Sequence, residues 1–167
     1  MTQARKPAPS DLSLVRQWFK SLQDCVQAVD YRAAYPLFAA DMVAFGTFSD
    51  FVAGRDRVAR EQWRNVWPTI RNFRWRLSGV KAIVSPDRLS AVGLAVWDSD
   101  GFHAGGARFD RRGRATVVFA RKATGRPWVA VHTHMSLFKG TPGRSHGKFG
   151  GRAVKSPFGR ANPAFGG

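Results

Sequence analysis

Two histidines near the end of the hydrophobic part of the chain have the residue type and spacing for acid–base chemistry. His132 and His134 lie two positions apart in an apolar and β-branched stretch, and Ser136 follows after the same interval. Residues two apart in a strand project from the same face. Imidazole binds and releases protons near pH 7. If this face lines a hollow, His132 and His134 are the candidate catalytic and substrate-binding residues.

The same pair has other interpretations, which the sequence leaves open. Two imidazoles at this spacing could hold a metal ion, but no carboxylate or cysteine completes such a site. We therefore predict no metal and no cofactor. The histidines could instead bond to backbone groups or lie in a dimer interface.

Aromatic side chains supply candidate walls for a ligand pocket. Such pockets are lined mostly by apolar and aromatic groups, with a few polar groups that fix orientation. Ordinary core packing is the simpler interpretation of any one of these residues, while together they favour a cavity for an apolar ring compound. The candidate substrate-binding walls are Tyr35, Phe45, Trp63, Trp67, Trp75 and Trp97.

Three helices in the N-terminal half must help to position these residues. Apolar residues recur at spacings of three and four between Leu12 and Val29, which predicts a long amphipathic helix capped by Ser10 or Asp11. A shorter helix follows, and Pro36 should kink or split it because proline lacks a backbone N–H. A third helix is expected over about Arg55–Trp67.

The rest of the hydrophobic region is predicted to form strands. Apolar residues alternate with arginines over Phe73–Leu77, which is typical of a half-buried strand. Because the helices come first and an antiparallel meander follows, the fold class is α+β. The remaining expected strands are Met42–Phe48, Val80–Ser85 (after a bulge at Gly79), Leu89–Asp98, Arg114–Lys122 and Trp128–Phe138, with a glycine-rich connection over 99–112.

Composition limits the class of protein. The chain has 167 residues, of which 44% are hydrophobic, enough for one domain with a core. Cys25 is the only cysteine, so no disulfide can form within the chain and a cytoplasmic location is expected. No apolar stretch approaches the roughly 20 residues of a membrane-spanning helix, and the polar N-terminus does not resemble a secretory signal.

A net charge of +16 has two interpretations. It could attract nucleic acid or an acidic partner, or it could simply give an arginine-rich solvated surface. Residues 139–167 are basic, rich in glycine and proline, and lack hydrophobic periodicity, which is typical of a disordered tail. We expect residues 1–10 to form a flexible arm and residues 11–138 to form the domain. The basic tail could bind an anionic partner, with its aromatic residues contacting that partner or stacking on nucleic-acid bases, or it could only aid solubility. These aromatic residues are Phe149, Phe158 and Phe165.

Three motifs along the chain together resemble a known family. Phe38–Asp41 leads into a strand, Gly54 and Arg55 open a helix, and the strand Gly113–Arg121 is followed by the strand Trp128–Ser136. Over about residues 11–138 the chain resembles the SnoaL-like domains of the nuclear transport factor 2-like superfamily, which also includes ketosteroid isomerase. The resemblance implies a cystatin-like cone, in which a curved antiparallel sheet wraps round three N-terminal helices and an apolar pocket. It also implies a homodimer formed through the outer face of the sheet.

One departure from the family argues against steroid isomerase chemistry. Where the ketosteroid isomerases are laid on this chain, their catalytic aspartate falls near Gly46 and their oxyanion-binding tyrosine near Leu22. Neither group is present. Epoxide hydrolysis and polyketide cyclisation on this fold also use acidic groups, and Glu61 is the only glutamate of the chain.

Two hypotheses for function follow. The first is a small-molecule-binding domain with an aromatic-lined pocket, which could also be an isomerase, cyclase or hydrolase assisted by His132 or His134. The alternative is a non-catalytic dimerisation or adaptor module whose basic tail binds an acidic partner or nucleic acid.

Overall fold

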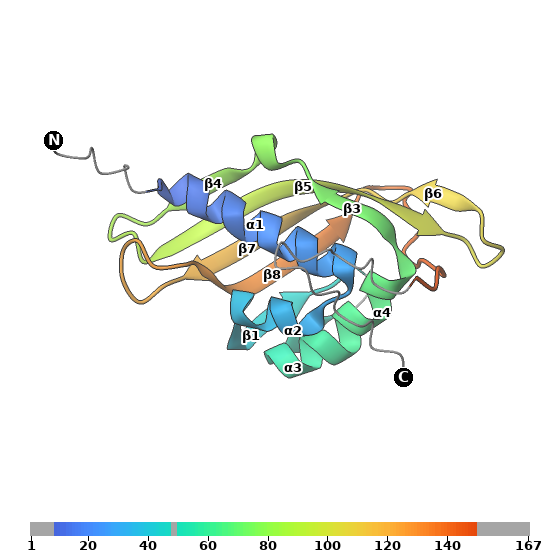
Figure 1. The fold of residues 1–167 in the computed structure, drawn as a ribbon, viewed down its shortest axis with the longest axis horizontal. Coiled ribbons are helices and arrows are strands. Elements are labelled where there is room, and N and C mark those ends of the chain that lie inside the picture. The colour runs from blue at the N-terminus through green and yellow to red at the C-terminus, as the bar shows by residue number, and fades with distance from the viewer. Residues whose placement is uncertain (1–8, 48–49, 150–167) are drawn as a thin grey trace, which may run out of the picture.

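A curved sheet and one long helix make up most of the molecule. The structure is a computed structural model, which describes residues 9–47 and 50–149. Helix α1 lies along one face of the sheet, and the shorter helices gather beside strand β1 (Figure 1). The predicted α+β architecture, a curved sheet round N-terminal helices, is confirmed.

Helix α1 spans Asp11–Ala28 and forms as its apolar periodicity predicts. The side chain of Ser10 accepts a hydrogen bond from the backbone N–H of Ser13, so Ser10 is the cap. The helix ends at Val29, which has a left-handed conformation. No helix within the described ranges is long and apolar enough to cross a membrane. The buried face of α1 consists of Val15, Trp18, Phe19, Leu22, Cys25 and Val26.

The second predicted helix is split at its proline, as expected. Helix α2 covers Tyr31–Ala34, and the 3-10 turn η1 continues it over Tyr35–Leu37 with Pro36 near its start. Strand β1 then begins at Phe38, four residues earlier than the sequence indicates.

The third predicted helix begins at Arg55 as expected, but its hydrogen bonding is irregular. A π-helical turn, η2, interrupts it in the middle, which widens the backbone there. This turn brings Gln62 and Trp63 inward as buried residues. The four consecutive pieces are α3 (Arg55–Val58), η2 (Ala59–Trp63), α4 (Arg64–Val66) and the 3-10 turn η3 (Trp67–Thr69).

The described strands form one sheet in the order β2-β1-β8-β7-β5-β3, and β4 and β6 both pair with β5. Every pair is antiparallel except β1 with β8, which run parallel, so the sheet is mixed rather than purely antiparallel. The strands are β1 (Phe38–Phe45), β2 (Phe51–Ala53), β3 (Arg71–Trp75), β4 (Lys81–Val84), β5 (Ser90–Phe102), β6 (Arg108–Asp110), β7 (Gly113–Ala120) and β8 (Val129–Leu137). The expected bulge at Gly79 is instead a 3-10 turn, η4 (Leu77–Gly79).

The glycine-rich segment after Asp98 is more regular than predicted. Strand β5 continues to Phe102 and forms a hairpin with β6. Gly101 pairs with Phe109 across the hairpin and leaves room for its ring, because a Cβ atom at Gly101 would lie 2.4 Å from that ring. The hairpin places Arg111, which follows β6, next to the core.

Residues 139–149, which the sequence assigns to the tail, lie against the domain. The backbone N–H of His146 donates to the carbonyl of Phe102 at 2.8 Å, and that of Phe149 donates to the carbonyl of Pro68 at 2.7 Å. Residues 1–8, 48–49 and 150–167 lie outside the described residues, and with them Phe158 and Phe165.

Candidate functional site

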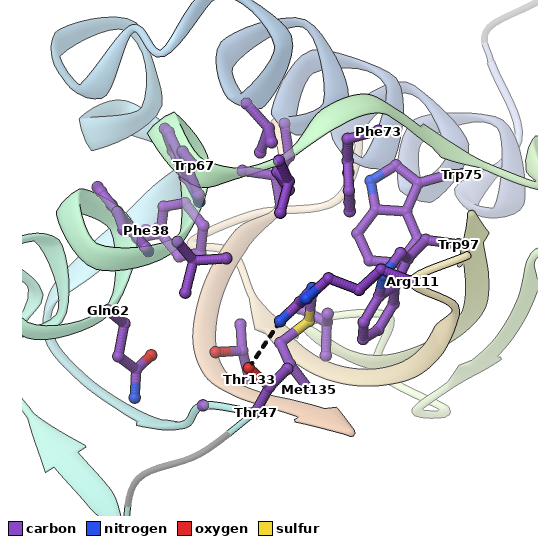
Figure 2. A pocket seen from close by; sticks show the side chains of 17 residues that line it. Phe38, Thr47, Gln62, Trp67, Phe73, Trp75, Trp97, Arg111, Thr133 and Met135 are labelled. Atoms are coloured by element: carbon purple, nitrogen blue, oxygen red, sulfur yellow. Dashed lines mark hydrogen bonds between the residues drawn. The ribbon is translucent and has the colours of Figure 1, made fainter. Parts of the chain in front are cut away.

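A cavity of about 80 Å³ lies between the C-terminal half of α1, the third helix and the sheet, with lining residues from β1, β3, β5, β7 and β8. Figure 2 shows aromatic side chains on two sides of it and polar groups of Arg111, Thr47 and Thr133 reaching toward its middle. Its aromatic walls are Phe38, Trp63, Trp67, Phe73, Trp75 and Trp97.

The aromatic walls support one another. The rings of Trp63 and Trp67 stack with centroids 5.1 Å apart, and those of Trp75 and Trp97 meet edge to face at 5.6 Å. Such contacts hold large side chains in fixed positions. All four tryptophans that the sequence suggested as walls therefore line the cavity.

The other two suggested walls lie elsewhere. Tyr35 is half-buried and packs against the ring of Trp63 from outside the cavity. The guanidinium of Arg55 lies 4.6 Å from the ring centre of Tyr35. Phe45 is 39% exposed and contacts the rings of His132 and His134.

The two candidate histidines lie on the opposite face of β8 from the cavity. Nδ1 of His132 is 2.8 Å from the carbonyl oxygen of Val43, and His134 is exposed. Thr133 and Met135, the alternate residues of the strand, line the cavity instead. The expectation that His132 and His134 face the hollow is thus corrected.

The register of β8 against β7 shifts at Val131, since Ala130 pairs with Phe119 and His132 with Val118. Ala130 and Thr133 are both buried, so this irregularity reverses the side-chain alternation before the histidines.

Arg111 is the charged residue of the described lining, and the sequence did not single it out as a site residue. Only 2% of its surface is exposed, and its Nη2 donates to Oγ1 of Thr47 at 3.0 Å. Within residues 9–47 and 50–149, its Nε has no hydrogen-bond partner and no carboxylate forms an ion pair with its guanidinium. Burial lowers the pKa of the guanidinium to about 10, so it is still a cation at pH 7.

Ser99 of strand β5 holds the backbone of Arg111 through two hydrogen bonds. The N–H of Arg111 donates to the carbonyl of Ser99 at 2.8 Å, and the hydroxyl of Ser99 donates to the carbonyl of Arg111 at 2.7 Å. Ser99 is itself buried. The hairpin of β5 and β6 therefore determines where the guanidinium enters the core.

The unpaired polar atoms of the cavity walls are all hydrogen-bond donors. Besides Nε of Arg111, the indole N–H groups of Trp75 and Trp97 are buried without a partner in the described chain. A buried donor without an acceptor is costly, and each such group calls for an explanation. A bound molecule that supplies acceptors and negative charge matches this set.

Groups for acid–base catalysis are missing from the described lining. It includes no aspartate, glutamate or histidine. Gly46 and Leu22, the positions where the family resemblance places the isomerase groups, do line the cavity, but they bring no such group to it. No cluster of metal-binding side chains occurs in the described parts of the chain.

Solved structures share the fold at low sequence identity. A ketosteroid isomerase-like protein from Erwinia carotovora atroseptica has a TM-score of 0.65 at 15% identity, covering 78% of this chain and 98% of that protein. The S. rosetta CaMKII hub has a TM-score of 0.64 at 15% identity, covering 78% and 99%. A nuclear transport factor 2-like superfamily protein from Salmonella enterica gives 0.60 at 18%, covering 75% and 92%. No protein-family model matches the sequence, and a search of curated proteins finds no match.

Proposed function

We propose that this domain, which has the nuclear transport factor 2-like fold, binds a small apolar molecule that carries an anionic group. The observation that carries the proposal is the buried guanidinium of Arg111, which faces an aromatic cavity and has no carboxylate partner in the described chain. The anion would pair with Arg111, and the apolar part would lie against the tryptophans.

Energetics support an anion at this place. Taking a charge out of water costs several kcal/mol unless a counter-charge and hydrogen bonds compensate. A carboxylate or phosphate can accept two parallel hydrogen bonds from one guanidinium, which are among the strongest in proteins. Nε of Arg111 has no acceptor among the described residues, and the same holds for the indole N–H of Trp97, another lining residue.

The size of the cavity narrows the ligand. An apolar cavity of about 150 Å³ can hold benzene, whereas this one measures about 80 Å³. A cavity of this volume favours a short aliphatic chain over an aromatic ring. The ring compound suggested by the sequence would require the aromatic walls to move apart.

The proposal is binding rather than acid–base catalysis. The described lining lacks the carboxylate or imidazole that proton transfer needs. The fold is shared by an isomerase-like protein and by a kinase hub, so it does not decide between the two kinds of function.

The test compares a charged ligand with its neutral isostere. Butyrate and butyramide have nearly the same shape, and acetate and benzoate extend the series in size. We expect butyrate, but not butyramide, to raise the melting temperature and to bind in calorimetric titrations at pH 7. Arg111→Met should abolish butyrate binding. Arg112→Met is the matched control, because Arg112 is exposed and pairs with Asp98 at the surface.

Two results would contradict the proposal. If butyramide binds as tightly as butyrate, the charge of the ligand does not contribute to binding. If Arg111→Met still binds butyrate, the Arg111 side chain is not the anion-binding group. Circular dichroism of Arg111→Met checks that the variant is folded.

We further propose that the chain associates with itself through the outer sheet face. Ile83 on β4 is 64% exposed and Leu94 on β5 is 37% exposed, although both are large apolar residues. One similar structure is a kinase hub. Light scattering after gel filtration should show a dimer or larger species that Leu94→Glu dissociates. A monomeric wild-type protein at micromolar concentration would refute this second proposal.

A further inference from the structure

A second, more polar chamber of about 320 Å³ adjoins the aromatic cavity. One wall is the segment 143–148 that follows the last strand, and another is the end of the third helix, with Asn65 and Thr69. Arg111 and Val66 line both spaces. Arg111 is therefore shared by an apolar cavity and a polar one.

The segment that closes this chamber is held in place by specific contacts. The hydroxyl of Ser145, a buried residue, donates to the carbonyl of Thr69 at 2.6 Å and accepts from the N–H of Phe102 at 2.9 Å. Gly147 permits the close approach, since a Cβ atom there would lie 2.6 Å from the carbonyl oxygen of Thr69. The segment is thus a built wall of the chamber.

The charges round the chamber have one sign. Arg144, Lys148 and Arg111 contribute cations, His146 contributes an imidazole, and none of the described lining residues is acidic. Arg144 and Lys148 are exposed, whereas Arg111 is buried without a carboxylate among the described residues. A multiply charged anion suits this arrangement better than a single carboxylate, because several cations can share its oxygens.

We propose that the chamber formed by segment 143–148 is a phosphate-binding subsite next to Arg111. The ligand of the domain is then an organic phosphate, whose phosphate group occupies the chamber and whose apolar group occupies the aromatic cavity. The assignment of the apolar group to the aromatic cavity rests on the proposed function. The phosphate subsite is argued independently, from the residues that line the chamber. Free inorganic phosphate has the same chemistry, so the experiment separates the two sources.

The probes are butyrate, butyl phosphate and inorganic phosphate, titrated at pH 7.5, where a phosphate monoester is mostly a dianion. The test variant is Arg144→Gln/Lys148→Gln. Its control is Lys122→Gln/Arg126→Gln, which removes the same charge from exposed residues of the turn between β7 and β8. We expect butyl phosphate to bind about tenfold more tightly than butyrate to the wild type.

The test variant should lose about tenfold in affinity for butyl phosphate and keep its affinity for butyrate, whereas the control pair should change by less than about twofold. If butyl phosphate binds no better than butyrate, or if the test variant binds it like the wild type, the subsite is refuted while butyrate binding still supports the proposed function. If inorganic phosphate alone binds as tightly as butyl phosphate and needs Arg144 and Lys148, the subsite is supported and the apolar role of the cavity is refuted.

Discussion

Strand β7 has a buried arginine beyond each of its ends, and the two side chains are partnered in opposite ways. Past the last residue of the strand, the Arg121 side chain has no exposed surface; its Nη2 lies 2.7 Å from Oδ1 of Asp11, and its guanidinium lies 3.9 Å from the ring centre of Trp128. Before the first residue, Arg111 is equally hidden but pairs only with the hydroxyl of Thr47 among described groups.

The difference separates a structural charge from a charge kept for another purpose. Arg121 ties the start of α1 to the turn before β8, and its Nε also donates to the carbonyl of Arg88 at 2.8 Å. Arg111 ties little together, yet the fold carries the cost of burying it. Departures from the usual rules of burial tend to lie at functional sites, and the aromatic cavity lies at the Arg111 end of the strand.

The largest effect on stability is expected at the paired end. Arg121→Met removes the ion pair and the hydrogen bonds to backbone carbonyls. Among the described residues, Asp11 then keeps only Arg88 as a partner. We expect the free energy of unfolding to fall by about 3 kcal/mol, as for other buried pairs that lose one partner. Urea denaturation measures the change. Lys122→Met, at an exposed neighbouring position, should stay within about 0.5 kcal/mol of the wild type, and an equal loss there would contradict the assignment.

The carboxylate of the same pair should make the protein sensitive to acid. The hydrogen bond from Arg88, together with Arg121, holds the pKa of Asp11 below its usual value of 3.8. Because the folded-state pKa is depressed, the stabilisation is complete above about pH 4 and is lost as the pH falls through the folded-state value. Between pH 7 and pH 3 the wild type should therefore lose more stability than Asp11→Asn. Equal losses in both proteins, measured by urea denaturation at each pH, would show that this pair does not titrate as described.

The sequence alone predicts the main features of the N-terminal helices. The cap at Ser10, the apolar face of α1 and the split at Pro36 all depend on residues close in the chain. Local patterns of this kind can be interpreted without tertiary contacts. The π-helical turn over Ala59–Trp63 has no such local pattern.

The site was harder to predict because it depends on distant contacts. Regular alternation from the buried Ala130 would turn His132 and His134 inward, but a register shift at Val131 turns Thr133 inward instead. Nothing in the local sequence marks this irregularity, because both faces of β8 carry apolar or amphipathic residues. Arg111 is one basic residue of a run that includes Arg112 and Arg114. What sets it apart is its contacts with Ser99 and Thr47, which are remote in sequence. The tryptophan walls are predictable from residue type, because ligand pockets are lined mostly by apolar and aromatic side chains.

The unpaired end should respond in the opposite direction. Arg111→Met replaces a buried cation by an apolar side chain of similar length, and no carboxylate of the described chain loses a partner. We expect the free energy of unfolding to rise by about 1–2 kcal/mol while the affinity for butyrate is lost. If Arg111→Met instead loses about as much stability as Arg121→Met, Arg111 has a structural role like that of Arg121, and the two arginines do not differ in the way described.

The smallest effect concerns the residue that positions Arg111. Ser99→Ala removes the hydrogen bond from the hydroxyl to the carbonyl of Arg111 and leaves a buried acceptor unpaired. We expect a loss of about 1 kcal/mol in unfolding free energy, together with weaker butyrate binding because the backbone of Arg111 is less firmly held. Ser136→Ala is the control, since Ser136 only accepts a 3.3 Å hydrogen bond from Arg114 at the surface. A Ser99→Ala protein that is destabilised but binds butyrate like the wild type would assign Ser99 to the fold alone. Reduced affinity would instead show that the hairpin of β5 and β6 places the unpaired charge for its ligand.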